Sequence, residues 1–415
     1  MSKKRVVITG MGLVSCFGKD VEEFHNNLVN GNSGVVDVND LNLEGLRTKF
    51  AARVSGFNAE DVLEKKEARR IDPCIPYAMQ AARDAVKMAG LDPKSIDPLK
   101  AGVIIGSGMG GMSVFLQNAT TLAIKGPSRV SPFFVPYILT NMPGAKVAID
   151  MGFKGPNYPI STACATSNHS MIAAAEHIRA GHADIMLTGG VEATMNMLCF
   201  AGFSAMRALS RSENPQTASK PWDKKRDGFV LGDGCGVFVF ESLESALKRG
   251  APILAEYRGG CVTCDAHHIT EPTPDGSDVA RCIEGALFDG GIKVEDVDLV
   301  NAHATSTPVG DLCEVYAIKK VFSSTLDKLK MHATKSIIGH GLGAAGALEM
   351  VAIIQAIRKG EIHPTINVDE PEDELKGINI VNHGAIKQDV RCAISNSFGF
   401  GGHNSVVAVS RYEGE

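Results

Sequence analysis

The hydrophobic positions of this chain fall into short runs that alternate with longer helical patterns. The short runs are rich in β-branched residues and end in glycine or small polar residues, which is typical of buried strands. A first set covers residues 6–9, 102–105, 184–188 and 236–240, with a helical segment at 165–180. A second set covers 253–257, 297–300, 391–395 and 405–409, with helical segments at 279–287 and 343–358. The alternation predicts an α/β protein.

The second set of elements looks like a shorter copy of the first. We therefore predict two related halves, 1–250 and 251–415, each of which buries a sheet between helices. No low-complexity tract or Pro/Ser-rich linker separates them, so the halves should pack closely. A cleft is expected where their strand ends meet, and chemistry should take place there.

Composition and charge exclude several classes of protein. The 415 residues are 44% hydrophobic and 21% charged, as in a compact globular protein. The net charge of −5 provides no overall basic field for nucleic acid. Segment 341–357 is interrupted by Glu349 and is too short to cross a membrane.

The ten cysteines and the N-terminus bear on the cellular compartment. The cysteines are scattered, as expected of reduced thiols, and this favours the cytoplasm. Residues 3–16 imitate a short signal peptide with a lipoprotein-like cleavage site. Gly10 and Gly12 interrupt its apolar part, however, so a buried first strand that enters a glycine turn is the preferred interpretation.

Two motifs suggest cofactors only weakly. Residues 106–111 have the spacing of a dinucleotide-binding loop, but no acidic residue lies between Gly111 and Asp150 to hold a ribose. The preferred interpretation is that the glycines allow the backbone to approach closely at the end of a central strand, and that Met109 offers an apolar wall to a ligand. Cys261 and Cys264, which precede two histidines, could suggest zinc, but no second Cys/His pair has the spacing of a zinc finger or ribbon.

Three other segments place reactive side chains at predicted strand–helix junctions. Cys164 lies where an extended stretch gives way to an Ala-rich helix, whose N–H groups and dipole are expected to lower the pKa of its thiol. His303 follows a strand, and Lys335 and His340 precede a glycine-rich helix. A structural role is open for each residue alone, but the combination favours covalent acyl chemistry.

Together with residues 396–404, these segments closely resemble the elongating β-ketoacyl-acyl-carrier-protein synthases of the thiolase-fold condensing-enzyme superfamily. The resemblance covers almost the whole chain and includes segments 7–15, 207–210, 221–229 and 363–367. It implies an α/β, thiolase-like, five-layered αβαβα fold made of two pseudo-symmetric halves. It also implies a homodimer that acts in fatty-acid elongation.

The resemblance further implies a catalytic set. Cys164 matches the nucleophile that accepts the growing acyl chain. His303 and His340 match the pair that would stabilise the enolate formed when malonyl thioester loses carbon dioxide. Lys335 would add positive charge and position the histidines. The backbone N–H groups of Cys164 and Phe400 would hold the tetrahedral oxyanion.

By the same resemblance, the segment around Phe398 and Phe400 is a mobile gate whose glycines permit movement. Met109 would limit the length of the acyl chain. The expected substrate contacts are Thr305, Thr307, Met109 and Thr270. No redox cofactor and no catalytic metal are implied, because phosphopantetheine arrives on the carrier protein. A structural monovalent cation could lie near Asn301, Glu349 and Asn396.

The carrier protein is acidic in this family, so a basic docking surface is expected. Lys65 with Arg69, and Lys66 with Arg70, have the spacing of one helical face, and Arg207 matches another docking position. An ordinary solvated charged face is the alternative.

Rival functions stay open on the sequence. They are a polyketide-type ketosynthase, a degradative thiolase, and a non-catalytic subunit like a chain-length factor. His403 and Ala304 depart from many bacterial relatives and resemble plant-type synthases. These departures leave the catalytic set intact, but the choice between synthase types I and II, and the preferred chain length, stay open.

Overall fold

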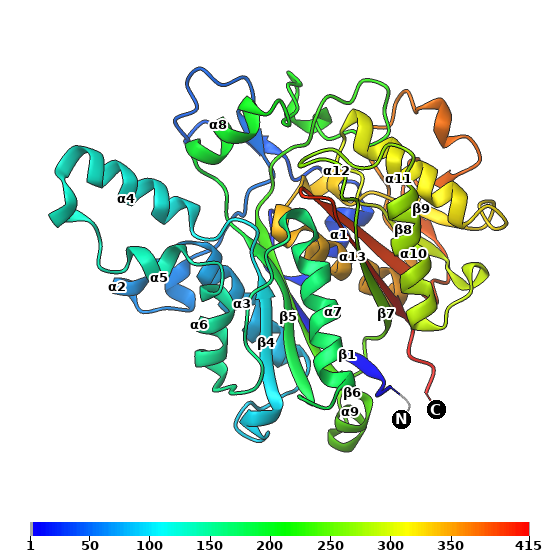
Figure 1. Ribbon diagram of the computed structural model, residues 1–415, viewed down its shortest axis with the longest axis horizontal. Coiled ribbons are helices and arrows are strands. Elements are labelled where there is room, and N and C mark those ends of the chain that lie inside the picture. The colour runs from blue at the N-terminus through cyan, green and yellow to red at the C-terminus, as the bar shows by residue number, and fades with distance from the viewer. Residues whose placement is uncertain (1–2, 415) are drawn as a thin grey trace.

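The computed structural model describes residues 3–414 and shows a mixed α/β architecture built on one long sheet (Figure 1). The order of its strands is β11-β9-β8-β13-β14-β7-β1-β6-β5-β4. The bounds of these strands are β1 Val6–Val14, β4 Ala101–Gly106, β5 Ile185–Glu192, β6 Gly234–Ser242, β7 Ala255–Cys264, β8 Leu299–Asn301, β9 Lys330–His332, β11 Asn379–Ile380, β13 Cys392–Gly399 and β14 His403–Ser410. The predicted strands of both sets are present, although β1 and β7 continue well past their predicted ends, to Val14 and Cys264.

The sheet has the same pairing pattern on both sides of its middle. On one side, β4 and β5 are parallel, while β5–β6 and β6–β1 are antiparallel. On the other side, β8 and β13 are parallel, while β13–β14 and β14–β7 are antiparallel. The two sides join where the start of β1 pairs antiparallel with the start of β7. The exact boundary at residue 250 stays a prediction.

Helices cover this sheet and also fill the space between its two halves. One half consists of β4, β5, β6 and β1, and the other of β8, β13, β14 and β7. Helix α3 packs on β1 and β6, and α10 packs on β7 and β14. Between the two sides lie α7, which contacts β4 and β5, and α13, which contacts β13 and β6 (Figure 1). The resulting order of layers is αβαβα, as predicted. The helix bounds are α1 Val21–Val29, α2 Lys65–Ala68, α3 Cys74–Met88, α4 Met112–Lys125, α5 Phe134–Ile138, α6 Met142–Met151, α7 Thr166–Arg179, α8 Met197–Ala205, α9 Leu243–Arg249, α10 Ser277–Gly290, α11 Pro308–Val321, α12 Lys335–Ile338 and α13 Ala345–Lys359.

The sequence explains why α13 occupies the central layer. Its residues are buried on every side from Ala345 to Ile357, as expected of a helix that is apolar all round. Its one acidic residue, Glu349, is fully buried and forms an ion pair with Lys335. Most of segment 341–357 is therefore a core helix, and none of the helices within residues 3–414 is long and apolar enough to cross a membrane.

The N-terminal segment is a core strand, as expected, but the predicted glycine turn is wrong, because β1 continues through Gly10 and Gly12 to Val14. All nine residues of β1 are buried. A Cβ atom at Gly10 would lie 2.1 Å from the carbonyl oxygen of Ala85, and one at Gly12 would lie 2.2 Å from that of Ala81. These glycines therefore allow α3 to pack directly against the strand.

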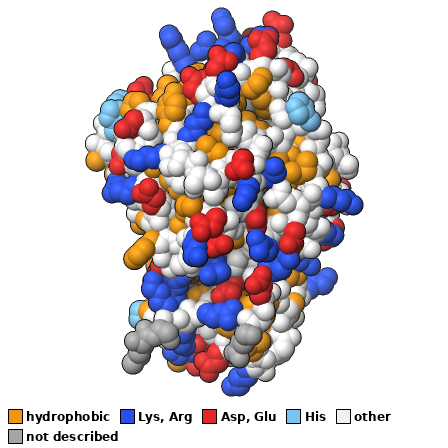
Figure 2. Space-filling view, turned by 90° about the vertical axis from the view of Figure 1, so that its right-hand side faces the viewer, with side chains coloured by type: hydrophobic (Ala, Val, Ile, Leu, Met, Phe, Trp, Pro, Cys, Tyr) orange, Lys and Arg blue, Asp and Glu red, His pale blue; other side chains and the backbone are white. Residues whose placement is uncertain are grey.

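On the face shown in Figure 2, basic and acidic side chains intermingle over the surface.

Candidate active site

A cavity of about 470 Å³ collects the predicted catalytic residues. Cys164, His303 and His340 line it, and they come from three separate chain segments. Cys164 lies in a single 3-10 turn, Ala163–Ala165, directly before α7. Its sulfur is 2.9 Å from Nε2 of His340. The predicted convergence of a thiol and two imidazoles is therefore present in the structure.

The expected ionisation of Cys164 is wrong. We expected the start of a helix to lower the pKa of the thiol, but burial raises that pKa to about 12. The positive charge of Lys335 opposes this rise, while the negative charge of Glu192 adds to it. The Cys164 residue is only 8% exposed, so the loss of hydration outweighs the nearby N–H groups. Cys164 is therefore a neutral thiol that faces the imidazole of His340.

The backbone around His340 is held on both sides. Its N–H donates to the carbonyl of Val230, and its own carbonyl accepts from the N–H of Gly232. The ring of Phe229 packs edge-on against the imidazole, with the ring centroids 5.2 Å apart. These contacts fix the direction in which Nε2 points toward the sulfur.

His303 is held by a carboxylate that the sequence analysis missed. Glu314, on α11, accepts the N–H groups of both His303 and Ala304 at 2.9 Å and also binds the side chain of Asn396. The imidazoles of His303 and His340 meet edge-on with centroids 5.5 Å apart. Glu314 thus sets the position of one member of the pair from eleven residues further along the chain.

Both imidazoles are neutral near pH 7. Burial, and after it the charge of Lys335, places the pKa of His303 and of His340 well below the usual range. A neutral imidazole can accept the Cys164 proton at Nε2, whereas an imidazolium cannot. We therefore expect the rate of acyl transfer to Cys164 to stay constant through pH 6.5, where a free histidine titrates, and to fall only well below it.

This pH dependence can be checked by measuring the acylation rate by intact mass across a buffer series. A decline centred near pH 6.5 would show that the histidines titrate as if they were exposed, and would contradict the expectation.

Lys335 is buried beside the catalytic set. It begins α12, is 1% exposed, and forms its ion pair with Glu349 of α13. Burial raises the pKa of Glu349 to about 7, and the positive charge of Lys335 opposes that rise. The pair joins the segment that carries His340 to the central helix.

Two of the three residues expected around a monovalent cation, Glu349 and Asn396, offer free oxygens that suit such an ion. Oε2 of Glu349 and Oδ1 of Asn396 are buried without a hydrogen-bond partner, as is Nδ2 of Asn301. Oδ1 of Asn301 accepts a hydrogen bond from Thr334. Unpartnered buried oxygens are what a hard cation prefers as ligands. Among residues 3–414, no group of three or more His, Cys, Asp or Glu is arranged to hold a metal ion.

The expected substrate and gate residues also reach the cavity. Its wall includes Met109, Thr270, Thr305, Thr307, Phe398 and Phe400. The hydroxyls of Thr305 and Thr307 lie 3.0 Å apart. The ring centroid of Phe398 lies 5.4 Å from that of His303. Phe400 lies in the turn between β13 and β14, where Gly401 and Gly402 have φ of +89° and +74°.

The turn between β13 and β14, which was predicted to be a gate, lies directly against the segment that carries Cys164. A Cβ atom at Gly399 would lie 2.5 Å from the carbonyl oxygen of Thr162 and 3.2 Å from the nitrogen of Cys164. Only glycine allows this approach. It places Gly399, the residue directly before Phe400, against the segment that carries Cys164.

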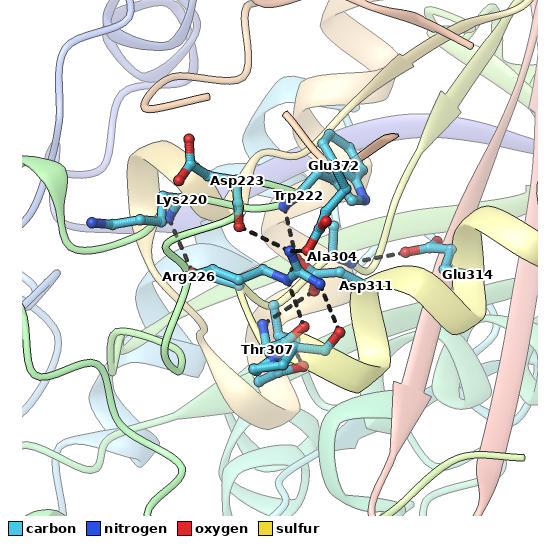
Figure 3. Close-up of polar contacts among 12 residues, drawn as sticks. Lys220, Trp222, Asp223, Arg226, Ala304, Thr307, Asp311, Glu314 and Glu372 are labelled. Atoms are coloured by element: carbon cyan, nitrogen blue, oxygen red, sulfur yellow. Dashed lines mark hydrogen bonds and ion pairs between the residues drawn. The ribbon is translucent and has the colours of Figure 1, made fainter. Parts of the chain in front are cut away.

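A buried arginine, also missed from the sequence, anchors the segment that carries Thr305 and Thr307 (Figure 3). The Arg226 guanidinium donates hydrogen bonds to three backbone carbonyls, those of Asp223, Thr307 and Pro308. It also donates to the carboxylate of Glu372 and forms an ion pair with Asp311 at 3.5 Å. Asp311 in turn accepts the N–H groups of Trp222 and Thr307. The network holds the threonine segment between residues 222–226 and Glu372.

We expect R226M to lower the free energy of unfolding by about 3–5 kcal/mol, because it leaves Asp311 buried without its cation. Urea unfolding would measure this change. The matched control is R281M, which removes an exposed pair with Asp278 and should cost about 1 kcal/mol or less. Equal losses in the two variants would show that the Arg226 network contributes no more than a surface pair.

The expected docking residues lie outside the cavity wall, with the exception of Arg207. All five are exposed. Helix α2 ends at Ala68, so the helical face predicted for Lys65, Lys66, Arg69 and Arg70 is one turn long and stops before both arginines. The side chain of Arg70 lies over the ring of Phe133. The basic group is therefore present, but it is not a continuous helical stripe.

The sequence belongs to a known family along most of its length. Residues 3–246 match the beta-ketoacyl synthase N-terminal domain, and residues 254–369 match the C-terminal domain of the same family. The 3-oxoacyl-(acyl-carrier-protein) synthase I, chloroplastic, of Arabidopsis thaliana is 53% identical over 99% of this chain and 87% of the relative. The 3-oxoacyl-(acyl-carrier-protein) synthase 2 of Staphylococcus aureus is 46% identical over 99% of both chains.

Solved structures show the same likeness. A type II polyketide ketosynthase in complex with its acyl-carrier protein superimposes with a TM-score of 0.92 at 33% identity, over 99% of this chain and 100% of the other. The ishigamide ketosynthase/chain length factor gives a TM-score of 0.91 at 34% identity, with the same coverage. By its sequence, its thiolase-like fold and the three side chains that meet in its cavity, this chain belongs to the beta-ketoacyl synthase family.

Proposed function

We propose that the protein is a 3-oxoacyl-acyl-carrier-protein synthase, an acyltransferase that extends fatty acyl chains by two carbons. The observation that carries the proposal is the 2.9 Å contact between the sulfur of Cys164 and Nε2 of His340, with the His303 imidazole beside it in one cavity. Relatives at 45–53% identity bear the names of type I and type II synthases, so the type stays open.

The first half-reaction is acyl transfer to Cys164. The sulfur attacks the thioester carbonyl of the acyl-carrier protein while Nε2 of His340 takes the thiol proton. The N–H groups of Cys164 and Phe400 stabilise the resulting oxyanion. When the tetrahedral intermediate collapses, the bond to the pantetheine sulfur breaks, and that thiolate receives the proton from His340.

The second half-reaction forms the carbon–carbon bond. Loss of carbon dioxide from malonyl-carrier protein leaves its electron pair on the α-carbon as an enolate, whose oxygen accepts hydrogen bonds from His303 and His340. The enolate carbon attacks the Cys164 thioester and forms the new carbon–carbon bond, the bond to the Cys164 sulfur breaks, and the released thiolate takes up a proton from solvent. Lys335 supports this step as a fixed positive charge near both imidazoles.

The cavity wall supports a long, flexible substrate. Thr305 and Thr307 would hydrogen-bond the pantetheine arm, Thr270 lies near its path, and Met109 lines the acyl end. Phe398 and Phe400 would open and close the cavity. The enzyme uses no redox cofactor in this scheme, and a cation held by Asn301, Glu349 and Asn396 would have a structural role only.

The partner is an acyl carrier protein that supplies both the acyl and the malonyl groups. A structural neighbour at 33% identity is a ketosynthase in complex with such a carrier, which supports this assignment. The exposed basic residues Lys65, Lys66, Arg69, Arg70 and Arg207 would attract the acidic carrier. Neither nucleic acid nor membrane insertion is part of the scheme.

A homodimer is the proposed assembly. Helices α4 and α5 project from the body of the molecule (Figure 1) and carry exposed apolar side chains that a second copy could cover, namely Phe115, Leu122, Ile124 and Val135. Sedimentation velocity should give the mass of two chains, and a monomer at micromolar concentration would contradict this assembly. A cytoplasmic location stays a prediction, since some relatives are named as chloroplastic.

Product analysis tests the function directly. Purified protein is incubated with malonyl-carrier protein and acyl-carrier proteins of graded length, and 3-oxoacyl products two carbons longer are expected. Activity with two acetyl-CoA molecules and none with malonyl-carrier protein would indicate a thiolase. Repeated extension without release would indicate a polyketide ketosynthase, and no acylation of Cys164 would indicate a non-catalytic subunit.

A further inference from the structure

A buried carboxylate in the cavity wall has no part in the scheme above. Glu192 is the last residue of β5, is 0% exposed, and lines the same cavity as Cys164. Its two oxygens accept four hydrogen bonds, which come from the N–H groups of Gly108, Met109 and Gly343 and from the hydroxyl of Ser107. No lysine or arginine within residues 3–414 forms an ion pair with it.

The four donors belong to two loops that are far apart in the sequence. Ser107, Gly108 and Met109 follow β4, whereas Gly343 lies in the 3-10 turn that comes directly after His340 and Gly341. The Glu192 carboxylate is therefore the bridge between the loop that carries Met109 and the turn that follows His340. One oxygen, Oε2, itself bridges Gly108 and Gly343, at 2.9 and 3.0 Å.

The bridge is packed without spare room. A Cβ atom at Gly108 would lie 2.7 Å from Oε2 of Glu192, and one at Gly343 would lie 2.6 Å from the same oxygen and from the nitrogen of Gly108. The hydroxyl of Ser107 also accepts the N–H of Gly110, so the loop is fixed at a further point. A displacement of the carboxylate must therefore move at least one of the two loops.

We propose that Glu192 is a positioning residue that sets the acyl-chain selectivity of the cavity, by tying the Met109 loop to the turn after His340. This inference rests on the proposed function, because it assumes that the acyl chain lies against Met109. Glu192 touches neither the thiol nor the imidazoles through any hydrogen bond, so it acts through the loops that it holds.

The chemistry of the bridge requires a carboxylate at this position. An ionised carboxyl group is an acceptor only, and all four of its partners here are donors. An amide of the same shape would direct its NH₂ group at two of these donors, and two buried N–H or O–H groups would lose their acceptor. Burial raises the pKa of Glu192 to about 7, but the four donors favour the ionised form.

The test compares E192Q with the wild-type protein in acyl transfer to Cys164, using butyryl- and tetradecanoyl-carrier protein as substrates. Intact mass gives the rate for each chain length, and a concentration series separates KM from kcat. We expect the ratio of kcat/KM for the long chain to that for the short chain to change by about tenfold or more, chiefly through KM of the long chain.

The matched control is E241Q. Glu241 is a fully buried carboxylate on β6, opposite the far end of β5, and its partners are Arg249, Thr9 and Ser245 rather than either loop. This control should keep the wild-type ratio. A wild-type ratio in folded E192Q, an equal loss for both chain lengths, or the same change in E241Q would overturn the proposal.

A second variant covers the case in which E192Q does not fold. S107A keeps the carboxylate but removes one of its four donors, so it should shift the ratio in the same direction by a smaller factor. An unchanged ratio in S107A, when E192Q does not fold, would count against the bridge. Failure of the wild-type protein to form any acyl-enzyme would instead refute the proposed function, so the two failures are distinguishable.

Discussion

Replacement of Cys164 by alanine is expected to abolish acyl-enzyme formation. Among the described residues, the cavity wall holds one other cysteine, Cys313, and its Sγ donates to the carbonyl of Thr273. Without the thiol, the acyl group cannot be held for attack, and condensation should fall by at least about a thousandfold. Intact mass after incubation with acyl-carrier protein measures the first effect, and formation of 3-oxoacyl product measures the second.

A matched control separates loss of the nucleophile from loss of a buried cysteine. Cys199 is also buried, on α8, but it does not line the cavity. C199A should still be acylated at full stoichiometry. If C164A were acylated as completely as C199A, another group would have to be the nucleophile and the assignment of Cys164 would fail.

The second large effect is expected from H303A. Removal of one donor to the enolate oxygen should slow decarboxylation of malonyl-carrier protein by about 10²–10³-fold. Acyl transfer to Cys164 should be much less affected, because His340 still lies 2.9 Å from the sulfur. The two steps can be measured apart, as release of carbon dioxide and as acylation of the protein.

The control for this variant is H25A. His25 is buried like His303, but it contacts Glu361 and lies outside the cavity wall. The H25A variant should decarboxylate malonyl-carrier protein at the wild-type rate. Equal losses in both half-reactions of H303A would mean that His303 supports the site as a whole rather than the enolate.

Much of the fold and the catalytic set could be predicted because the signals are local. The hydrophobic runs that became β4, β8 and β13 are short and continuous, and they end at glycine or small polar residues. Cys164, His303 and His340 each follow or precede such an element, so their convergence follows from the meeting of strand ends. The resemblance to a family then assigned each of them a role.

The supporting residues could not be predicted because their partners lie far away in the sequence. Glu192 accepts a hydrogen bond from Gly343, 151 residues further on, and Arg226 binds Glu372, 146 residues further on. In the sequence each is an ordinary charged residue near a strand or loop. Only the fold shows that the side chains of Glu192 and Arg226 are both buried and that each charged group binds several backbone groups.

The prediction of a lowered pKa for the Cys164 thiol was wrong for a related reason. The start of α7 is visible in the sequence, and its N–H groups alone would lower the pKa of the thiol. The burial that raises the pKa comes from segments that lie elsewhere in the chain, including the gate turn around Gly399 and the turn that holds His340. Local sequence shows the first effect and not the second.

The central claim is that an acyl group held on Cys164 is the direct partner of the malonyl-derived enolate. It is tested by a single-turnover experiment, in which protein acylated at Cys164 and freed of excess substrate is mixed with malonyl-carrier protein. We expect the acyl mass to leave the protein as a 3-oxoacyl-carrier product two carbons longer appears with equal stoichiometry. An acyl group that stays on Cys164 while that product forms would contradict the claim.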